Sequence, residues 1–422
     1  MRGLRAVALL IIVFTCAGLA GCWDRRELNN IAFVFTMGIS RAPNGDFLVG
    51  LQIPIPRKLA GRGGGGAKGG GAEQNSLVRT TQGPTVDGAL RKLGAVLGRS
   101  LSFGHCDVII VKDDVAKDGG LASLLDFISR FWEFRRQTII LVSSRDPVEI
   151  LLSSPELETT LGENLAKTVQ EAIHDSSVCY ISTVREILER QSILGAHVVL
   201  GRVDLVNDPD GNRTSIVEGA AVFERNRLVG FLDGDETRGL NIILNHIRGS
   251  ALSLDLTAGL PADGEAGPTP GYHAGERDNK SPDAAVPRPT VSVFITRFNS
   301  KTAARLEGGQ PVIDVKINVT GQVTEASYAV PLQSPGGLSA LNGALAKRVE
   351  GLCRAAIAKT QSFPVGCDVF FFSEAIHDRF PAVWAAISDR WDEYYKTLKV
   401  NVIVNANIIE SGMACDPISP HR

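Results

Sequence analysis

Two adjacent residues, His105 and Cys106, place a possible base beside a possible thiol nucleophile. The apolar stretch CDVIIV at residues 106–111 predicts a buried strand. On a strand, neighbouring side chains point to opposite faces, so this imidazole cannot pair with this thiol. The pattern therefore favours one buried and one exposed side chain over a nucleophilic site, which needs both groups within hydrogen-bond reach.

Acidic residues near a histidine suggest a metal site in the segment SEAIHDRF. Glu374 and His377, with Asp378 beside them, are three residues apart and would share one face of a helix. The remaining histidines have no spacing that could supply further ligands. We therefore expect a glutamate at a helix start and a surface or packing histidine.

The segment DGDETRG, residues 233–239, is a second acidic cluster. A calcium loop needs oxygen ligands at alternate positions that end in a bidentate glutamate, and that register is missing. We interpret the segment as a charged turn in which Arg238 pairs with a nearby carboxylate. Because the chain also lacks GxSxG and HExxH motifs, the sequence predicts neither an enzyme nor a metal site.

The start of the chain has the layout of a secretory signal peptide. Arg2 and Arg5 precede a wholly apolar stretch at residues 6–14, and small residues then lead into Cys22. The apolar stretch is shorter than the roughly 20 residues that cross a bilayer. We therefore expect residues 1–21 to be removed rather than to remain as a membrane helix.

Residues Leu19, Ala20, Gly21 and Cys22 resemble a bacterial lipoprotein box. In such signals the chain is cut before the cysteine, whose thiol carries diacylglycerol. Two acyl chains should anchor the protein stably, because each buried methylene contributes about 0.8 kcal/mol. This diacylglycerol and an N-acyl lipid on Cys22 are the only covalent groups we expect, and we expect no other cofactor. An ordinary buried or disulfide-bonded cysteine is the alternative.

Composition limits the class of protein. A chain of 422 residues is long enough for two or three domains, and loss of Arg2 and Arg5 changes its formal net charge from −2 to −4. This balance argues against nucleic-acid binding, which usually requires a basic patch. The cysteines after Cys22 are too widely spread for a disulfide scaffold or a CxxC metal site. They are Cys106, Cys179, Cys353, Cys367 and Cys415.

Strand and helix patterns alternate along most of the chain, which predicts an α/β to α+β fold. We expect several domains with small mixed sheets packed against helices. Strands are expected at residues 31–39, 46–53, 106–111, 137–143, 197–206, 214–223, 224–232, 290–298, 313–319 and 398–408. Helices are expected at residues 85–98, 120–132, from 147 after an Asp146 cap, over most of 156–193, and at 337–360 and 381–396.

After the signal peptide at 1–21, we expect an N-terminal domain at 22–200 and a C-terminal domain at 201–412, with a tail at 413–422. The glycine-rich run at 61–72 formally contains GxGxxG but lacks GK[ST], so we interpret it as a flexible surface loop. Residues 249–289 are rich in Gly, Pro, Ala and Asp and lack periodicity, which predicts a disordered linker or loop within the second domain.

Several segments together resemble one family over nearly the whole mature chain. This family consists of the GerAC-like C-subunit lipoproteins of nutrient germinant receptors in endospore-forming bacteria. The most specific features are the lipobox followed by Trp23 and Asp24, the sequence Glu236-Thr237-Arg238-Gly239, and the closing segment. The matching segments are residues 21–34, 102–111, 133–143, 219–240 and 372–412.

The resemblance implies a non-enzymatic, lipid-anchored subunit on the outer face of the spore inner membrane. It also implies two integral-membrane partners, the A and B subunits, and a role in triggering germination by small nutrients. Trp23, Asp24 and residues 236–239 are then candidate structural or partner contacts. A lipid-anchored solute-binding protein that captures the nutrient is the main alternative, and a cell-wall hydrolase or metalloprotein is a third.

Overall fold

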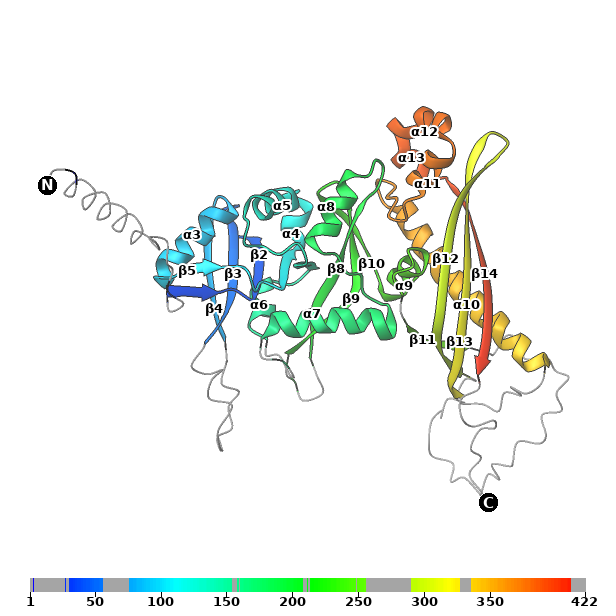
Figure 1. Cartoon of the computed structure of the whole chain (residues 1–422), viewed down its shortest axis with the longest axis horizontal. Helices are drawn as coiled ribbons and strands as arrows, with labels where there is room; N and C mark the ends of the chain where they lie inside the picture. Colours follow the sequence, from blue (N-terminus) through cyan, green and yellow to red (C-terminus); the bar gives the residue numbers. More distant parts are fainter. Residues whose placement is uncertain are drawn as a thin grey trace, which may run out of the picture.

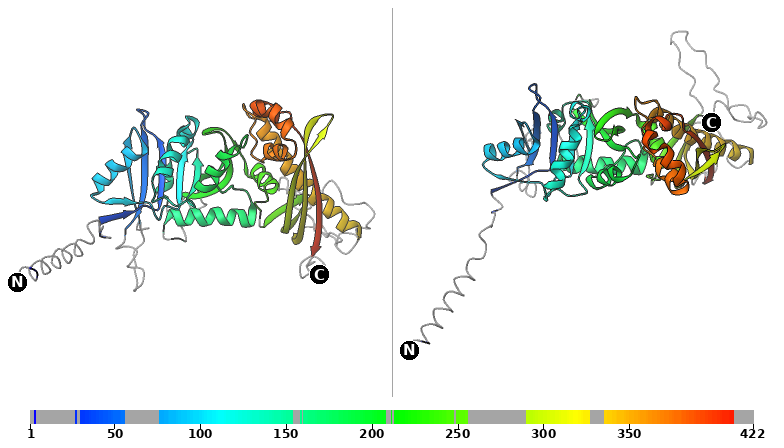
Figure 2. Two further views of the ribbon diagram at one scale, coloured as in Figure 1. Left: turned by 45° about the horizontal axis from the view of Figure 1, so that its top comes forward. Right: turned by 90° about the horizontal axis from the view of Figure 1, so that it is seen from above.

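The computed structural model describes residues 30–55, 76–153, 160–207, 213–247, 249–255, 290–326 and 335–410, with the single residues 3, 27, 158 and 211. The molecule is elongated, and its sheets follow one another along the long axis (Figures 1 and 2). We call residues 30–232 the N-terminal lobe and residues 233–410 the C-terminal lobe. The mixed helices and sheets confirm the predicted fold class.

One eight-stranded sheet forms the centre of the N-terminal lobe. Its strand order is β10-β9-β8-β7-β6-β2-β3-β4. The inner strands β2, β6, β7 and β8 run parallel, and an antiparallel meander extends each edge. The strands are β2 (Thr36–Arg41), β3 (Phe47–Pro54), β4 (Ser76–Gly83), β6 (Val108–Lys112), β7 (Ile139–Ser143), β8 (Val198–Asn207), β9 (Arg213–Glu224) and β10 (Arg227–Leu232).

Helices cover both faces of this sheet, which is why its inner strands are nearly continuous apolar runs. On one face lie α3 (Val86–Leu97), α4 (Asp113–Lys117), α5 (Gly120–Arg130) and α8 (Val184–Ser192). On the other lie α6 (Pro147–Leu151) and α7 (Leu161–Glu171), which continues as the π-turn η3 (Ala172–Ser176). A separate parallel pair, β1 (Ile31–Phe33) and β5 (Ser100–Ser102), lies beside the sheet.

The structure contains the predicted hairpin turn after β2 and the predicted helix cap before α6. Asn44 and Gly45 form the β2–β3 turn, with Gly45 at a φ of 86° that glycine adopts without strain. The Asp146 side chain accepts a hydrogen bond from the Val148 N–H, and Pro147 occupies the first position of α6. These caps and turns set where each element begins.

The C-terminal lobe contains a four-stranded sheet covered on one face by a long helix. The strand order is β11-β12-β13-β14, with β13 and β14 parallel and the other pairs antiparallel. The elements are α9 (Gly234–Ile243), β11 (Ser250–Asp255), β12 (Thr290–Glu307), β13 (Gln310–Ala326), α10 (Pro335–Ser362) and β14 (Lys399–Glu410). Between α10 and β14 is a group we call the helical cap: α11 (Phe372–Arg379), α12 (Pro381–Ile387), η4 (Ser388–Arg390) and α13 (Trp391–Tyr395).

Three expectations need correction. The expected strand 31–39 is two strands, because β1 pairs with β5 whereas β2 joins the large sheet. The expected linker 249–289 begins with β11, where Leu252 and Leu254 are buried; residues 256–289 lie outside the described residues. The expected helix 381–396 is interrupted by a 3-10 turn. The expected domain boundary at 200/201 stays a prediction; it lies within β8, and the large sheet continues to Leu232.

Other expectations fall partly or wholly outside the described residues. These include the signal peptide at 1–21, Cys22, the glycine-rich loop at 61–72 and the tail at 413–422. None of the helices within the described ranges is both long and apolar enough to cross a membrane.

Candidate functional site

The two lobes share one continuous hydrophobic core. Val199, Ala220 and Val222 project from the large sheet into a cluster that also contains residues of α9, α10, the four-stranded sheet and the helical cap. Buried hydrogen bonds of Arg190, Asn241 and Asp368 lie beside this cluster. The junction between the lobes is therefore the candidate functional site.

The segment DGDETRG is the start of helix α9 and not a loop turn. Asp233 is the N-cap, and its carboxylate accepts a hydrogen bond from the Glu236 N–H at 2.8 Å. The Glu236 carboxylate accepts one in return from the Asp233 N–H at 2.9 Å, which completes a capping box. The prediction of a turn is therefore wrong, and Asp233 and Glu236 cap the N-terminus of a helix.

Arg238 links this helix to the N-terminal lobe. Its side chain is 13% exposed, and Nη1 lies 3.2 Å from Asp235 Oδ1, so the expected local ion pair is present. Its Nε donates to the Ser176 carbonyl oxygen, in η3, at 2.8 Å. Burial lowers the pKa of Arg238, and the Asp235 carboxylate opposes that effect. Arg348 of α10 binds the other carboxylate oxygen of Asp235 at 2.8 Å.

Thr237 and Gly239 face the interior of the junction. Thr237 is fully buried. Gly239 packs directly on the α10 backbone, since a Cβ at this position would overlap the Leu352 carbonyl oxygen. One helical turn after Thr237, the Asn241 side-chain amide donates to the carbonyl oxygens of Ser177 and Cys179, both at 2.9 Å. Helix α9 is thus clamped between α10 and the end of the η3 turn.

Replacing Arg238 by alanine should destabilise the folded chain by about 2–3 kcal/mol. The substitution removes both the charged hydrogen bond to the Ser176 carbonyl oxygen and the ion pair with Asp235. Arg348→Ala is the matched control, since it removes only an exposed ion pair with Asp235. The Arg348 side chain is 40% exposed and the Asp235 side chain 49%. Exposed pairs contribute about 0–1 kcal/mol. Urea unfolding of both variants measures the difference, and equal midpoints would show that Arg238 is not a junction contact.

A second polar connection crosses the junction at Arg190, near the end of α8. The Arg190 side chain is 6% exposed, and its Nη1 donates to the carbonyl oxygens of His197 and Val369, both at 3.1 Å. Its Nη2 donates to the Tyr180 hydroxyl at 2.8 Å. The guanidinium also lies 4.3 Å from the centre of the Phe371 ring. One cation therefore holds backbone groups of both lobes.

Asp368 organises the start of the helical cap beside this connection. It is fully buried, and its carboxylate accepts hydrogen bonds from the backbone N–H groups of Phe370, Phe372 and Ser373 at 3.1, 3.2 and 2.7 Å. Burial raises its pKa, and these backbone donors oppose the rise. Its carbonyl oxygen accepts a hydrogen bond from the His197 N–H at 3.0 Å. Cap and sheet are therefore joined through the backbone.

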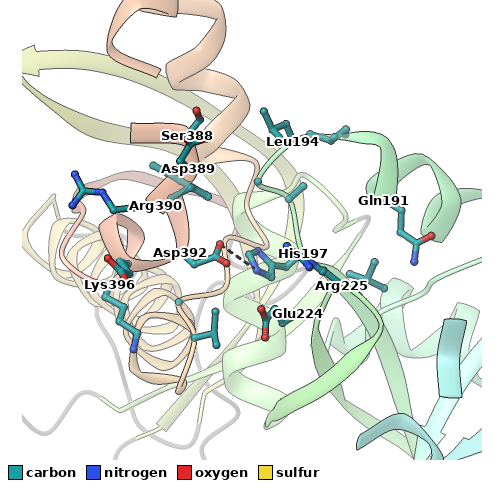
Figure 3. Close-up of a pocket in the computed structure, with 18 of the residues that line it drawn as sticks. Gln191, Leu194, His197, Glu224, Arg225, Ser388, Asp389, Arg390, Asp392 and Lys396 are labelled. Atoms are coloured by element: carbon teal, nitrogen blue, oxygen red, sulfur yellow. Dashed lines mark ion pairs between the residues drawn. The ribbon is translucent and has the colours of Figure 1, made fainter. Parts of the chain in front are cut away.

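A cleft of about 920 Å³ opens where the α8–β8 turn and the β9–β10 turn meet the helical cap (Figure 3). At its base His197 Nε2 lies 3.5 Å from Asp392 Oδ1, and this contact crosses the junction. Burial raises the pKa of Asp392, and so does the charge of Glu224, whereas His197 and Arg225 lower it. The charged residues that line the cleft are His197, Glu224, Arg225, Asp389, Arg390, Asp392, Glu393 and Lys396.

The buried cysteines of the described chain are poor nucleophiles. Burial raises the pKa of the Cys179 thiol to about 12, and it also raises those of Cys106, Cys353 and Cys367 well above their usual value. These thiols therefore do not form nucleophilic thiolates at neutral pH. Within the described residues, His, Cys, Asp and Glu side chains form no group that could hold a metal ion.

The other candidate residues lie apart from the junction cleft or outside the described chain. Cys106 is buried and His105 is exposed, as the sequence predicts, although β6 starts only at Val108. Glu374 and His377 are both exposed on α11. The lipoprotein-box residues Leu19, Ala20, Gly21 and Cys22, followed by Trp23 and Asp24, lie outside the described residues.

Sequence reasoning missed Arg190, His197 and Asp368. For Arg190 a signal existed, because it follows the buried Val184 and Ile187 at helical spacing on α8. A charged residue in register with an apolar stripe indicates a buried, paired cation. The sequence around His197 and Asp368 carries no such signal, because their contacts are with segments that are distant in sequence.

Comparison with known sequences and structures gives one consistent result. Residues 24–205 match the family "Spore germination protein N-terminal domain", and residues 218–412 match "Spore germination B3/GerAC like, C-terminal". Spore germination protein KC of Bacillus subtilis (strain 168) is 26% identical over 98% of this chain and 97% of that protein. Spore germination protein B3 of the same organism is 19% identical over 95% and 97%. The crystal structure of the GerBC protein superimposes with a TM-score of 0.51 at 17% identity, and the match covers 92% of this chain and all of that one.

Proposed function

Because the chain belongs to the spore germination B3/GerAC-like family, we propose that it is the lipoprotein subunit of a nutrient germinant receptor. In this proposal it has no enzymatic activity and is anchored through lipid on Cys22 at the outer face of the spore inner membrane. It assembles there with two integral-membrane subunits, A and B, and the complex triggers germination. The observation that supports the proposal is the match of both family domains, in order, over residues 24–205 and 218–412.

The junction supports a role in assembly or signal transmission over catalysis. Residues 236–239, which the sequence singled out, hold α9 between the lobes. A rigid junction of this kind fixes the angle between two surfaces, which is what a scaffold between membrane subunits requires. The solute-binding alternative predicts two similar lobes, whereas the two sheets here have eight and four strands in unrelated orders.

An affinity pull-down of the tagged protein from detergent-extracted spore membranes tests the proposal. The wild-type chain should recover two polytopic membrane proteins, identified by mass spectrometry. Cys22→Ala should abolish lipid labelling and reduce this recovery at least tenfold, because a chain without two acyl groups is only weakly held at the membrane.

The matched control for the pull-down is Cys353→Ala, which removes a buried thiol far along the chain and keeps the anchor. Recovery of the lipoprotein without any membrane protein would contradict the receptor-subunit proposal. In that case direct titration of small nutrients would test the solute-binding alternative, with the junction cleft as the expected site.

A further inference from the structure

Three chain segments meet at one edge of the large sheet. Strands β2, β6 and β7 are parallel and in register, with Thr36 beside Val108 and Val108 beside Ile139. The segments that precede them therefore lie side by side. The Asp107 N–H donates to the Phe35 carbonyl oxygen at 3.1 Å, and the Ile139 N–H donates to the Asp107 carbonyl oxygen at 2.9 Å. We call residues 33–35, 103–107 and 131–137 the strand-start edge.

The strand-start edge exposes an aromatic and basic set of side chains. Trp132 is 87% exposed, which is unusual for a tryptophan in a folded chain. Arg135 and Arg136 are exposed, and neither is within ion-pair distance of a carboxylate among the described residues. His105 is exposed between Phe33 and Phe35, with ring centres at 5.5 and 5.8 Å.

The acidic groups of this edge are already engaged. The Glu133 carboxylate accepts a hydrogen bond from the Phe103 N–H at 3.1 Å, which also places Trp132 next to the end of β5. Asp107 is half-buried, and burial raises its pKa, although Arg135 and His105 oppose that rise. The fully exposed charged side chains of this edge are therefore Arg135 and Arg136, whereas Glu133 and Asp107 are half-buried.

The position of this edge relative to the chain start indicates which surface the edge can contact. Strand β1 pairs with β5, so the chain enters the lobe directly beside the strand-start edge. Seven residues separate Cys22 from Asn30, the start of the continuously described chain, and the eight Cα–Cα steps between them span at most about 28 Å. The β1–β5 pair, where the chain enters, lies toward the end of the molecule opposite the four-stranded sheet (Figures 1 and 2).

We propose that the strand-start edge docks on an anionic bilayer surface, with Trp132 at the interface and Arg135 and Arg136 at lipid phosphates. Tryptophan is favoured at the membrane–water interface, and basic residues near a surface are attracted to anionic headgroups. The docked edge orients the N-terminal lobe relative to the bilayer. This inference rests on the proposed anchor at Cys22, because the short tether is what brings the edge to the membrane.

The test uses the mature polypeptide with Cys22→Ala, which carries no lipid, so that only the protein surface can bind. Vesicles of phosphatidylcholine with about one-third phosphatidylglycerol are sedimented with the protein, and vesicles of pure phosphatidylcholine serve as the uncharged comparison. The protein should co-sediment with the anionic vesicles but not with the vesicles of pure phosphatidylcholine. Arg135→Glu/Arg136→Glu should lower the partition coefficient at least tenfold, and Trp132→Ala should lower it severalfold at every ionic strength.

Two controls separate docking from general electrostatics. Lys301→Glu/Lys347→Glu makes the same charge change at exposed positions of the C-terminal lobe and should leave the partition coefficient within twofold of the parent. Matching thermal unfolding curves show that the exposed substitutions leave the fold intact.

Equal losses in both double variants, or no co-sedimentation of the parent chain, would overturn the docking proposal. Neither result affects the anchor, because flotation of the lipidated chain with vesicles tests Cys22 independently. If the parent fails to bind vesicles but Arg135→Glu/Arg136→Glu abolishes recovery of the membrane subunits, the edge is a protein contact instead.

Discussion

Gly239→Val should destabilise the folded chain by at least about 3 kcal/mol, because overpacking of a tight contact forces backbone movement. A Cβ at position 239 would overlap the Leu352 carbonyl oxygen, and it would lie 3.1 Å from Ala356 Cβ. Neither neighbour can yield, since one is helix backbone and the other is the smallest apolar side chain. Helix α9 must therefore move away from α10, and with it the contacts of Arg238 and Asn241 to the N-terminal lobe.

Urea unfolding of Gly239→Val and limited proteolysis measure this effect. We expect faster cleavage between the lobes, since the loss of α9 packing loosens the junction before either sheet unfolds. Gly343→Ala is the matched control: it lies on α10, where a Cβ meets nothing within 4 Å. It should be neutral or stabilise by up to about 1 kcal/mol, because alanine lowers the entropy of the unfolded chain. An unchanged midpoint for Gly239→Val would refute the close contact between α9 and α10.

The elements of this fold were predictable where one face of a strand or helix carries the signal. Helix α3 begins after the Thr85 cap and ends at Gly98, as its apolar spacing and the flanking residues indicate. Strand β11 was not recognisable, because only Leu252 and Leu254 alternate within six residues. The split between β1 and β2 depends on different pairing partners, which no local pattern encodes.

The candidate site was predictable in its position but not in its form. Glu236 and Arg238 were recognised as important, yet the capping box could be mistaken for a turn because it carries the same acidic residues. The partners of these side chains come from residues such as Ser176 and Leu352, which are distant in the sequence. Long-range geometry of this kind requires the three-dimensional structure.

Arg190→Met should destabilise the folded chain by about 3–5 kcal/mol. Methionine keeps an unbranched apolar stem, so the packing of the side chain is largely retained. The exchange leaves the carbonyl oxygens of His197 and Val369 and the Tyr180 hydroxyl without their donor. Each buried polar group left unsatisfied costs about 1–3 kcal/mol.

Arg185→Met on the same helix is the matched control, since Arg185 is exposed and lies 3.6 Å from Glu189 in a surface pair. That pair contributes about 0–1 kcal/mol, so the variant should unfold close to the wild-type midpoint. Near-equal midpoints for the two variants would show that water replaces the Arg190 donors. Because Arg190 is the cation that bonds to backbone of both lobes, its loss should also weaken recovery of the membrane subunits when they contact both lobes. Reduced recovery with Arg190→Met but not with Arg185→Met would connect the rigidity of the junction to receptor assembly.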